Sequence, residues 1–147
     1  MNIIEAKSTV ASLSHGVRVR LAVFAAALWW GSLTMLGALV VPMLFAHLPT
    51  PAMAGNMAAR LFSAQTWVST ACGVLLLMLS ASPVQGAGRV ATTWVLAGTL
   101  LALLLEFAVT PHIVARENLA LWHGLGTGFF ALQWLFATTT LWQAIDS

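Results

Sequence analysis

The stretch that decides the fold is "LLALLLEFAVTPHIVARENLALWHGLGTGFF", Leu100 to Phe130. It begins as an apolar run that carries one carboxylate, Glu106, and it continues past His112 and His123 into a second apolar run. Long apolar runs with almost no charge are typical of helices that cross a membrane. The stretch therefore predicts the end of one transmembrane helix, a short connection and the start of the next.

The composition of the whole chain leads to the same class of protein. Hydrophobic residues make up 60% of the 147 and charged residues only 7%, whereas a soluble domain has about 25% charged residues. We therefore expect a membrane protein with the lipid bilayer as its surroundings. The net charge is +2 and there is no basic run, so no nucleic-acid partner is expected.

Uncharged segments divide the chain into four expected spans. A bilayer core requires about 20 apolar residues as a helix, and the segments that satisfy this lie near 21–46, 61–80, 90–109 and 119–141. No strand alternation competes with this interpretation. The sequence predicts an all-α fold, an antiparallel bundle of four transmembrane helices in one domain, 21–147, preceded by a cytoplasmic lead-in, 1–20.

The basic residues give an expected orientation. With both termini inside, four of them lie in the cytoplasm and two outside: Lys7, Arg18, Arg20 and Arg89 against Arg60 and Arg116. The positive-inside rule favours this N-in and C-in arrangement. We expect a multi-pass protein of the bacterial inner membrane whose ionisable residues gather at the outer, periplasmic face.

Small residues and a proline indicate how the helices pack. Gly124 and Gly128 form a GxxxG in the fourth span, and Gly31 plays the matching part in the first. Such residues let helix backbones approach closely in a membrane, so we expect them at packing surfaces of the bundle. Pro42 cannot donate a hydrogen bond to the carbonyl of Ala38, which predicts a kink near the outer end of the first helix.

Glu106 allows two interpretations. A carboxylate inside a span is costly unless it is paired, and by default it indicates a functional site. It lies about one turn inside the outer end of the third span, however, and Arg60 opens the second span on that side. Glu106 is therefore expected either to bond Arg60 or a histidine and hold the bundle together, or to belong to a site. The structural polar pair that we predict is Arg60 with Glu106.

Histidines on the same side raise the question of a bound metal or haem. His47, His112 and His123 are each compatible with an ordinary interface position, yet imidazoles from different helices can also clamp a haem b group. Thioether and imidazole ligands suit copper, and this option uses Met43, His47 and His112 with Glu106. No CxxCH occurs, so a haem would be bound non-covalently.

Catalytic chemistry finds little support. The only aspartate is Asp146 in the tail, and the only cysteine, Cys72, is expected in mid-span. The sequence therefore favours a non-enzymatic protein, an accessory or interaction subunit of a membrane complex that associates with other membrane subunits or with itself. The alternative is a haem- or copper-binding membrane protein with its site on the outer face.

Four segments carry a resemblance to a known family: "LWWGSLTMLGALVVPMLF" (Leu28 to Phe45), "AGNMAARLF" (Ala54 to Phe62), "TPHIVAR" (Thr110 to Arg116) and "LWHGLGTGFFALQWL" (Leu121 to Leu135). Over about residues 21–141 the chain resembles the small four-helix membrane proteins typified by transmembrane protein 205, whose bacterial members form a domain of unknown function. The resemblance implies the four-helix fold and no settled activity.

Overall fold

The computed structural model describes residues 3–80 and 88–146, and the side chains of 16–80 and 92–146. The residues described form helices and short turns, without a strand, so the expected all-α class is confirmed. Three helices are long and apolar enough to cross a membrane, Gly16–His47, Pro51–Ser80 and Thr92–Val114. These helices indicate a membrane protein.

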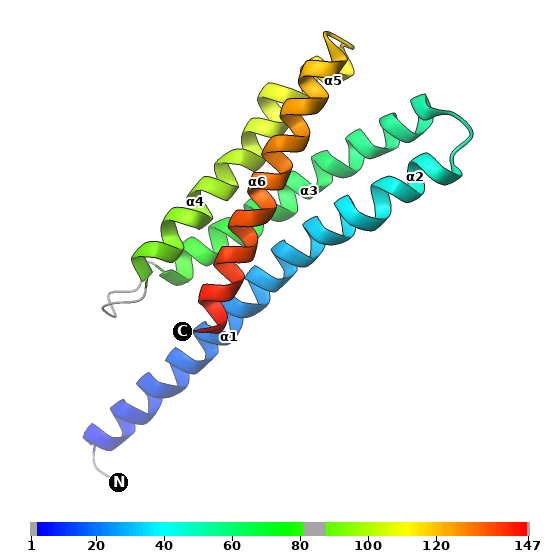
Figure 1. Ribbon diagram of the computed structural model, residues 1–147. Helices are drawn as coiled ribbons and strands as arrows, with labels where there is room; N and C mark the ends of the chain where they lie inside the picture. Colours follow the sequence, from blue (N-terminus) through cyan, green and yellow to red (C-terminus); the bar gives the residue numbers. More distant parts are fainter. Residues whose placement is uncertain (1–2, 81–87, 147) are drawn as a thin grey trace.

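The helices form two hairpins (Figure 1). The first consists of α1 (Ile3–Met35), the π-helical turn η1 (Leu36–Val40), α2 (Val41–His47) and the returning α3 (Pro51–Ser80). The second consists of α4 (Gly88–Leu104), the π-helical turn η2 (Leu105–Val109), α5 (Thr110–Val114) and the returning α6 (Leu119–Ile145). Connections 48–50 and 115–118 lie at one end of the bundle, which we call the distal end.

The fourth long helix is α6 (Leu119–Ile145). α6 has 27 residues, which corresponds to a length of about 40 Å at the rise of an α-helix and is enough for a bilayer core. It does not belong to the three candidate spans found among the described residues. The structure thus gives three apolar spans and a fourth helix of matching length.

The observed boundaries extend beyond the uncharged segments. α1 begins at Ile3 and runs without a break into the first span, so residues of the expected lead-in are helical from there on. α3 begins at Pro51 rather than near residue 61. A capping contact explains this start, since Thr50 Oγ1 accepts a 3.2 Å hydrogen bond from the Met53 N–H and proline suits the first helical position.

Both outgoing helices widen into a π-helical turn just before a proline. In η1 the Val41 N–H reaches the carbonyl of Leu36, and Pro42 follows directly. In η2 the Thr110 N–H reaches the carbonyl of Leu105, and Pro111 follows. A proline removes one hydrogen bond and its ring crowds the preceding turn, so the distortion expected at Pro42 takes the form of a π-helical turn, and Pro111 has an equivalent one.

The two hairpins correspond in register as well as in direction. Gly37 and Glu106 each lie five residues before the proline of their own hairpin. Phe62 and Phe130 are each the twelfth residue of the returning helix, and Gln65 and Gln133 are each the fifteenth. The chain is therefore arranged as a parallel repeat of one helical hairpin, a common architecture of membrane bundles.

The tightly packed core lies away from the distal end. Trp29 is fully buried, and Gly98 makes room for it, since a Cβ at Gly98 would lie 2.6 Å from the Trp29 ring. The other members of the cluster are small or aliphatic: Ala25, Ala26, Leu33, Cys72, Leu76, Val95 and Ala137. Large apolar side chains such as Phe24 and Met78 point outward, as expected of a surface in contact with lipid.

Candidate functional site

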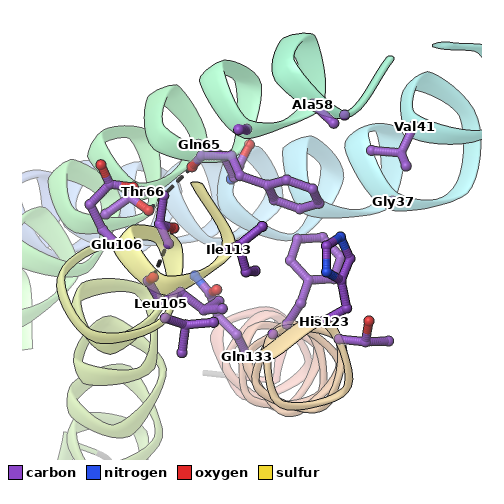
Figure 2. Close-up of a pocket in the computed structure, with 18 of the residues that line it drawn as sticks. Gly37, Val41, Ala58, Gln65, Thr66, Leu105, Glu106, Ile113, His123 and Gln133 are labelled. Atoms are coloured by element: carbon purple, nitrogen blue, oxygen red, sulfur yellow. Dashed lines mark hydrogen bonds between the residues drawn. The ribbon is translucent and has the colours of Figure 1, made fainter. Parts of the chain in front are cut away.

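A pocket of about 320 Å³ lies between the helices in the distal half of the bundle (Figure 2). Residues of η1, α2, α3, η2, α5 and α6 line it. Most of the lining is apolar, and a few polar side chains converge on it. Pockets of this kind, with volumes from about 300 Å³ upward, are typical sites for small ligands.

Matching positions of the two hairpins line this pocket. Pairs in equivalent positions include Phe62 with Phe130, Gln65 with Gln133, and Gly37 with Glu106. The two phenylalanine rings meet edge to face, with their centroids 5.3 Å apart. A Cβ at Gly37 would lie 2.8 Å from the Phe130 ring, so the glycine is what allows this ring to reach the pocket.

The polar groups come unequally from the two hairpins. Where the second hairpin has ionisable or hydroxyl-bearing residues, the first has small or apolar ones: Glu106 against Gly37, Thr110 against Val41, His123 against Gly55, and Thr127 against Ala59. The first hairpin thus provides space. The second hairpin provides most of the ionisable and hydroxyl groups.

Glu106 is only half satisfied by its hydrogen bonds. Ser63 Oγ of α3 donates a 2.9 Å hydrogen bond to Glu106 Oε1. The second oxygen, Oε2, is buried and has no hydrogen-bond partner. Buried polar atoms are rarely left unpaired in folded proteins, so a carboxylate oxygen in this state at a pocket wall indicates a place for a ligand.

The expected pair between Glu106 and Arg60 does not form. The side chain of Arg60 is exposed, and the ion pair found among the described residues joins His112 to Glu117. Ser63 follows Arg60 by three residues on α3 and lies almost one turn deeper in the bundle. It is Ser63 that faces the Glu106 carboxylate. The partner of Glu106 is therefore a neutral hydroxyl.

Two glutamines in the middle of the returning helices border the same space. Gln65 Nε2 donates to Ser32 Oγ at 2.9 Å and to Ser69 Oγ at 3.2 Å, which uses both of its hydrogens and leaves Oε1 as the group that can meet a ligand. Gln133 is only 2% exposed, and its Nε2 is buried without a partner. Two buried groups of the lining, on η2 and on α6, thus lack partners.

The histidines are placed separately. His123 lines the pocket at the end away from Glu106, as Figure 2 shows, and its Nδ1 lies 3.1 Å from the Leu119 carbonyl. His112 stacks on Trp122 with the ring centroids 4.0 Å apart, and its Nδ1 lies 2.7 Å from Glu117 Oε2. These contacts tie His112 to the distal connection.

His47 lies in a different place from His123. Together with Met43 it borders a shallow apolar hollow on α2, and its Nδ1 lies 3.0 Å from the Met43 carbonyl. In the part of the chain that the structure describes, no three His, Cys, Asp or Glu side chains are grouped to hold a metal ion. The structure thus distributes the expected haem or copper ligands over three places: Met43 with His47, Glu106 with His123, and His112 at the distal connection.

The glycines expected to pack the bundle face outward instead. A Cβ added at Gly31, Gly124 or Gly128 would meet nothing within 4 Å. Gly126 points inward, where its Cβ would contact Val109 at 3.5 Å. The reason is that the buried face of α6 follows Gln133, Ala137 and Thr140, and the GxxxG lies away from that stripe.

Sequence reasoning missed Ser63, Gln65 and Gln133. The two glutamines were visible as amides inside otherwise apolar segments, where polar side chains usually face protein. Ser63 gave no comparable signal, because serines are common in membrane helices and often bond only to their own backbone. The role of Ser63 depends on the contact between α3 and η2, and this contact cannot be predicted from the sequence of one helix.

The fold and the pocket define a class of protein, a membrane-type helical bundle built from two hairpins around a mostly apolar pocket. Residues 24–120 match the family described as Domain of unknown function (DUF4149), and the chain belongs to this family. The matched region contains Ser63, Gln65 and Glu106 but ends before Gln133. The comparisons found no similar protein among the curated proteins and none among the solved structures.

Proposed function

We propose that this protein is an integral membrane protein that binds one small, mostly apolar molecule in the distal pocket and holds its polar group at Glu106. The observation that carries the proposal is the buried Glu106 Oε2 without a partner at the wall of an apolar pocket. A buried polar atom without a hydrogen-bond partner costs free energy, on the order of 1 to 3 kcal/mol. A ligand that supplies the missing contact would remove this cost.

The buried amide of Gln133 supports the same proposal. It lines the pocket, and its Nε2 has no partner, so the cavity presents a second polar group in need of a contact. The equivalent glutamine of the first hairpin, Gln65, has partners in Ser32 and Ser69. The unpaired state of Gln133 Nε2 and Glu106 Oε2 favours a binding site.

The membrane arrangement belongs to the proposal. We place α6 across the bilayer as a fourth span, because it packs along α1 and α4 and has a sufficient length. The charge distribution favours both termini inside a bacterial inner membrane and the distal end outside. The likeness to the transmembrane protein 205-like proteins is part of the same proposal, and it rests on the sequence segments that contain Pro42, Phe62 and His123.

An accessory or interaction role is the second candidate, and the outward GxxxG of α6 favours it. Gly124 and Gly128 are exposed, with open space beside them, which is the surface that lets another transmembrane helix approach closely. Gly128→Ile would block that approach. We expect this variant to lose a complex that wild type forms in mild detergent, measured by mass photometry, and equal masses for both proteins would contradict the role.

Haem or copper binding is the weakest alternative, since the expected ligands share a pocket only in twos, Met43 with His47 and Glu106 with His123. Absorption spectra and elemental analysis of protein expressed with haem and copper available test it. A Soret band, or copper in equal amount to protein, that is lost in His47→Ala would establish this function.

The test of pocket binding uses two glycines of one helix. Gly126→Leu fills the pocket, whereas Gly128→Leu places the same side chain on the outer surface. Each protein is purified in mild detergent and extracted with organic solvent, and the extract is analysed by mass spectrometry. We expect a compound that accompanies wild type and Gly128→Leu in similar amounts and is absent from Gly126→Leu.

Identical extracts from all three proteins would contradict the proposal. Folding is checked by circular dichroism and gel filtration. If Gly126→Leu does not fold, Gly126→Ala replaces it, because its Cβ would make only ordinary contacts, between 3.5 and 3.9 Å. A reduced amount of the compound is then expected.

A further inference from the structure

We propose that the molecule bound in the distal pocket is an organic monocation, an amine or quaternary ammonium with an apolar body. This inference rests on the proposed function, since it names the class of ligand for the same pocket. It is carried by the charge of the lining. Among the described residues that line the pocket, Glu106 is the only acidic one, and none is lysine or arginine.

The protein gives Glu106 no countercharge. The serine on Oε1 is neutral, and the Arg60 side chain is exposed and forms no ion pair with it. A buried carboxylate is stabilised by a cation or by a proton. A ligand with a positive charge would therefore bind in a place where the protein has a negative charge and no competing cation.

The other polar groups offer mainly acceptors. Gln65 is left with Oε1, because its Nε2 hydrogens go to two serines. His123 is left with Nε2 as acceptor in its neutral form, because the partner of Nδ1 is a carbonyl. Gln133 is the exception, because its unpaired Nε2 is a donor. Acceptor atoms suit the N–H groups of a protonated amine, and their partial negative charge also attracts a quaternary ammonium.

Aromatic rings line the pocket close to these groups. Phe62 and Phe130 meet edge to face, and Phe45 also contributes to the wall. The faces of aromatic rings attract organic cations. The mixture of one carboxylate with phenyl rings is thus complementary to a positive charge on an apolar body.

The size and polarity of the pocket favour an organic ion over a metal ion. A metal ion requires several close ligands, and no group of three such side chains exists in the described part of the chain. The volume of about 320 Å³ has room for a molecule with a ring and a substituted nitrogen. The apolar walls would cover the body of such a molecule.

The test compares two probes of nearly the same shape. Phenyltrimethylammonium carries a permanent positive charge, and tert-butylbenzene is its neutral isostere. Both are used in tritiated form, in equilibrium dialysis against the purified full-length protein in nanodiscs. The variants are Glu106→Gln, Gly126→Leu and a matched control, Glu117→Gln, which makes the same change at the exposed partner of His112.

We expect saturable binding of phenyltrimethylammonium to wild type and to Glu117→Gln. Glu106→Gln should weaken it at least tenfold, and Gly126→Leu should abolish it. Equal cation affinity of wild type and Glu106→Gln would overturn the inference, whatever else binds.

The two probes separate the failure of the inference from the failure of the proposed function. If tert-butylbenzene binds saturably, is excluded by Gly126→Leu, and the cation does not bind, the pocket is a binding site for neutral molecules and the charge inference is wrong. If neither probe binds and the extracts of all variants are identical, the proposed function is wrong as well.

Discussion

Ser63 of α3 holds Glu106 of η2 through a 2.9 Å hydrogen bond that joins residues 43 positions apart in the sequence. The bond connects the two hairpins at the edge of the distal pocket. It orients the carboxylate through Oε1 and leaves Oε2 unpaired. A neutral donor in this place fixes the position of the charge without cancelling it.

Ser63→Ala should therefore destabilise the protein by about 1 to 2 kcal/mol, because it leaves both carboxylate oxygens without a donor. Thermal unfolding in detergent measures the change. Ser80→Ala is the control, since Ser80 on the same helix bonds only to the Leu76 carbonyl. In a double-mutant cycle with Glu106→Gln, the two effects should be coupled, and strict additivity would show that the bond contributes nothing.

The equivalent glutamines should respond in opposite ways to one substitution. Gln65→Leu removes the amide that donates hydrogen bonds to Ser32 and Ser69, so we expect a lower melting temperature. Gln133→Leu removes a buried amide without a partner, so we expect a higher melting temperature of the ligand-free protein. Similar destabilisation by both would show that Gln133 has a structural partner.

The packing of Gly98 against Trp29 gives a third prediction. Gly98→Ala would place a Cβ 2.6 Å from a fully buried ring, and overpacking of this kind costs about 1 to 3 kcal/mol. Gly31→Ala, with open space around it, should be neutral or slightly stabilising because alanine favours the helix. The two melting temperatures should therefore differ by several degrees, and equal values would contradict the packing described.

The number of spans can be tested with single cysteines in a Cys72→Ala background. Four spans place residue 118 outside and residue 146 inside. A membrane-impermeant maleimide should thus label Asn118→Cys in intact cells and label Asp146→Cys only after permeabilisation. Labelling of both in intact cells would show that α6 does not cross.

The sequence predicted the class of fold well, because hydropathy and charge are properties of single segments. Glu106 and His123 could also be recognised as polar residues near the distal end, and both line the pocket. The partner of Glu106 could not be recognised. Arg60 was the obvious choice by charge, but the choice between Arg60 and Ser63 depends on how α3 is rotated against η2.

The sequence also could not show which face of α6 is buried. A GxxxG serves equally well for packing within a bundle and between bundles, and only the position of the buried stripe distinguishes the two. The correspondence of the hairpins was not recognised in the sequence either, because Gly37 and Glu106 are unlike residues at the same distance from Pro42 and Pro111. It became evident once both prolines were found to follow a π-helical turn.

Gly37 and Glu106 occupy equivalent positions of the two hairpins, but only Glu106 has an ionisable side chain, and this difference has an electrostatic consequence. Two copies of the second hairpin, arranged like the two hairpins of this chain, would place two carboxylates around one small cavity, where like charges repel strongly because little water screens them. Joining two different hairpins in one polypeptide avoids this conflict. The chain keeps the near-symmetric frame and holds a single negative charge within it.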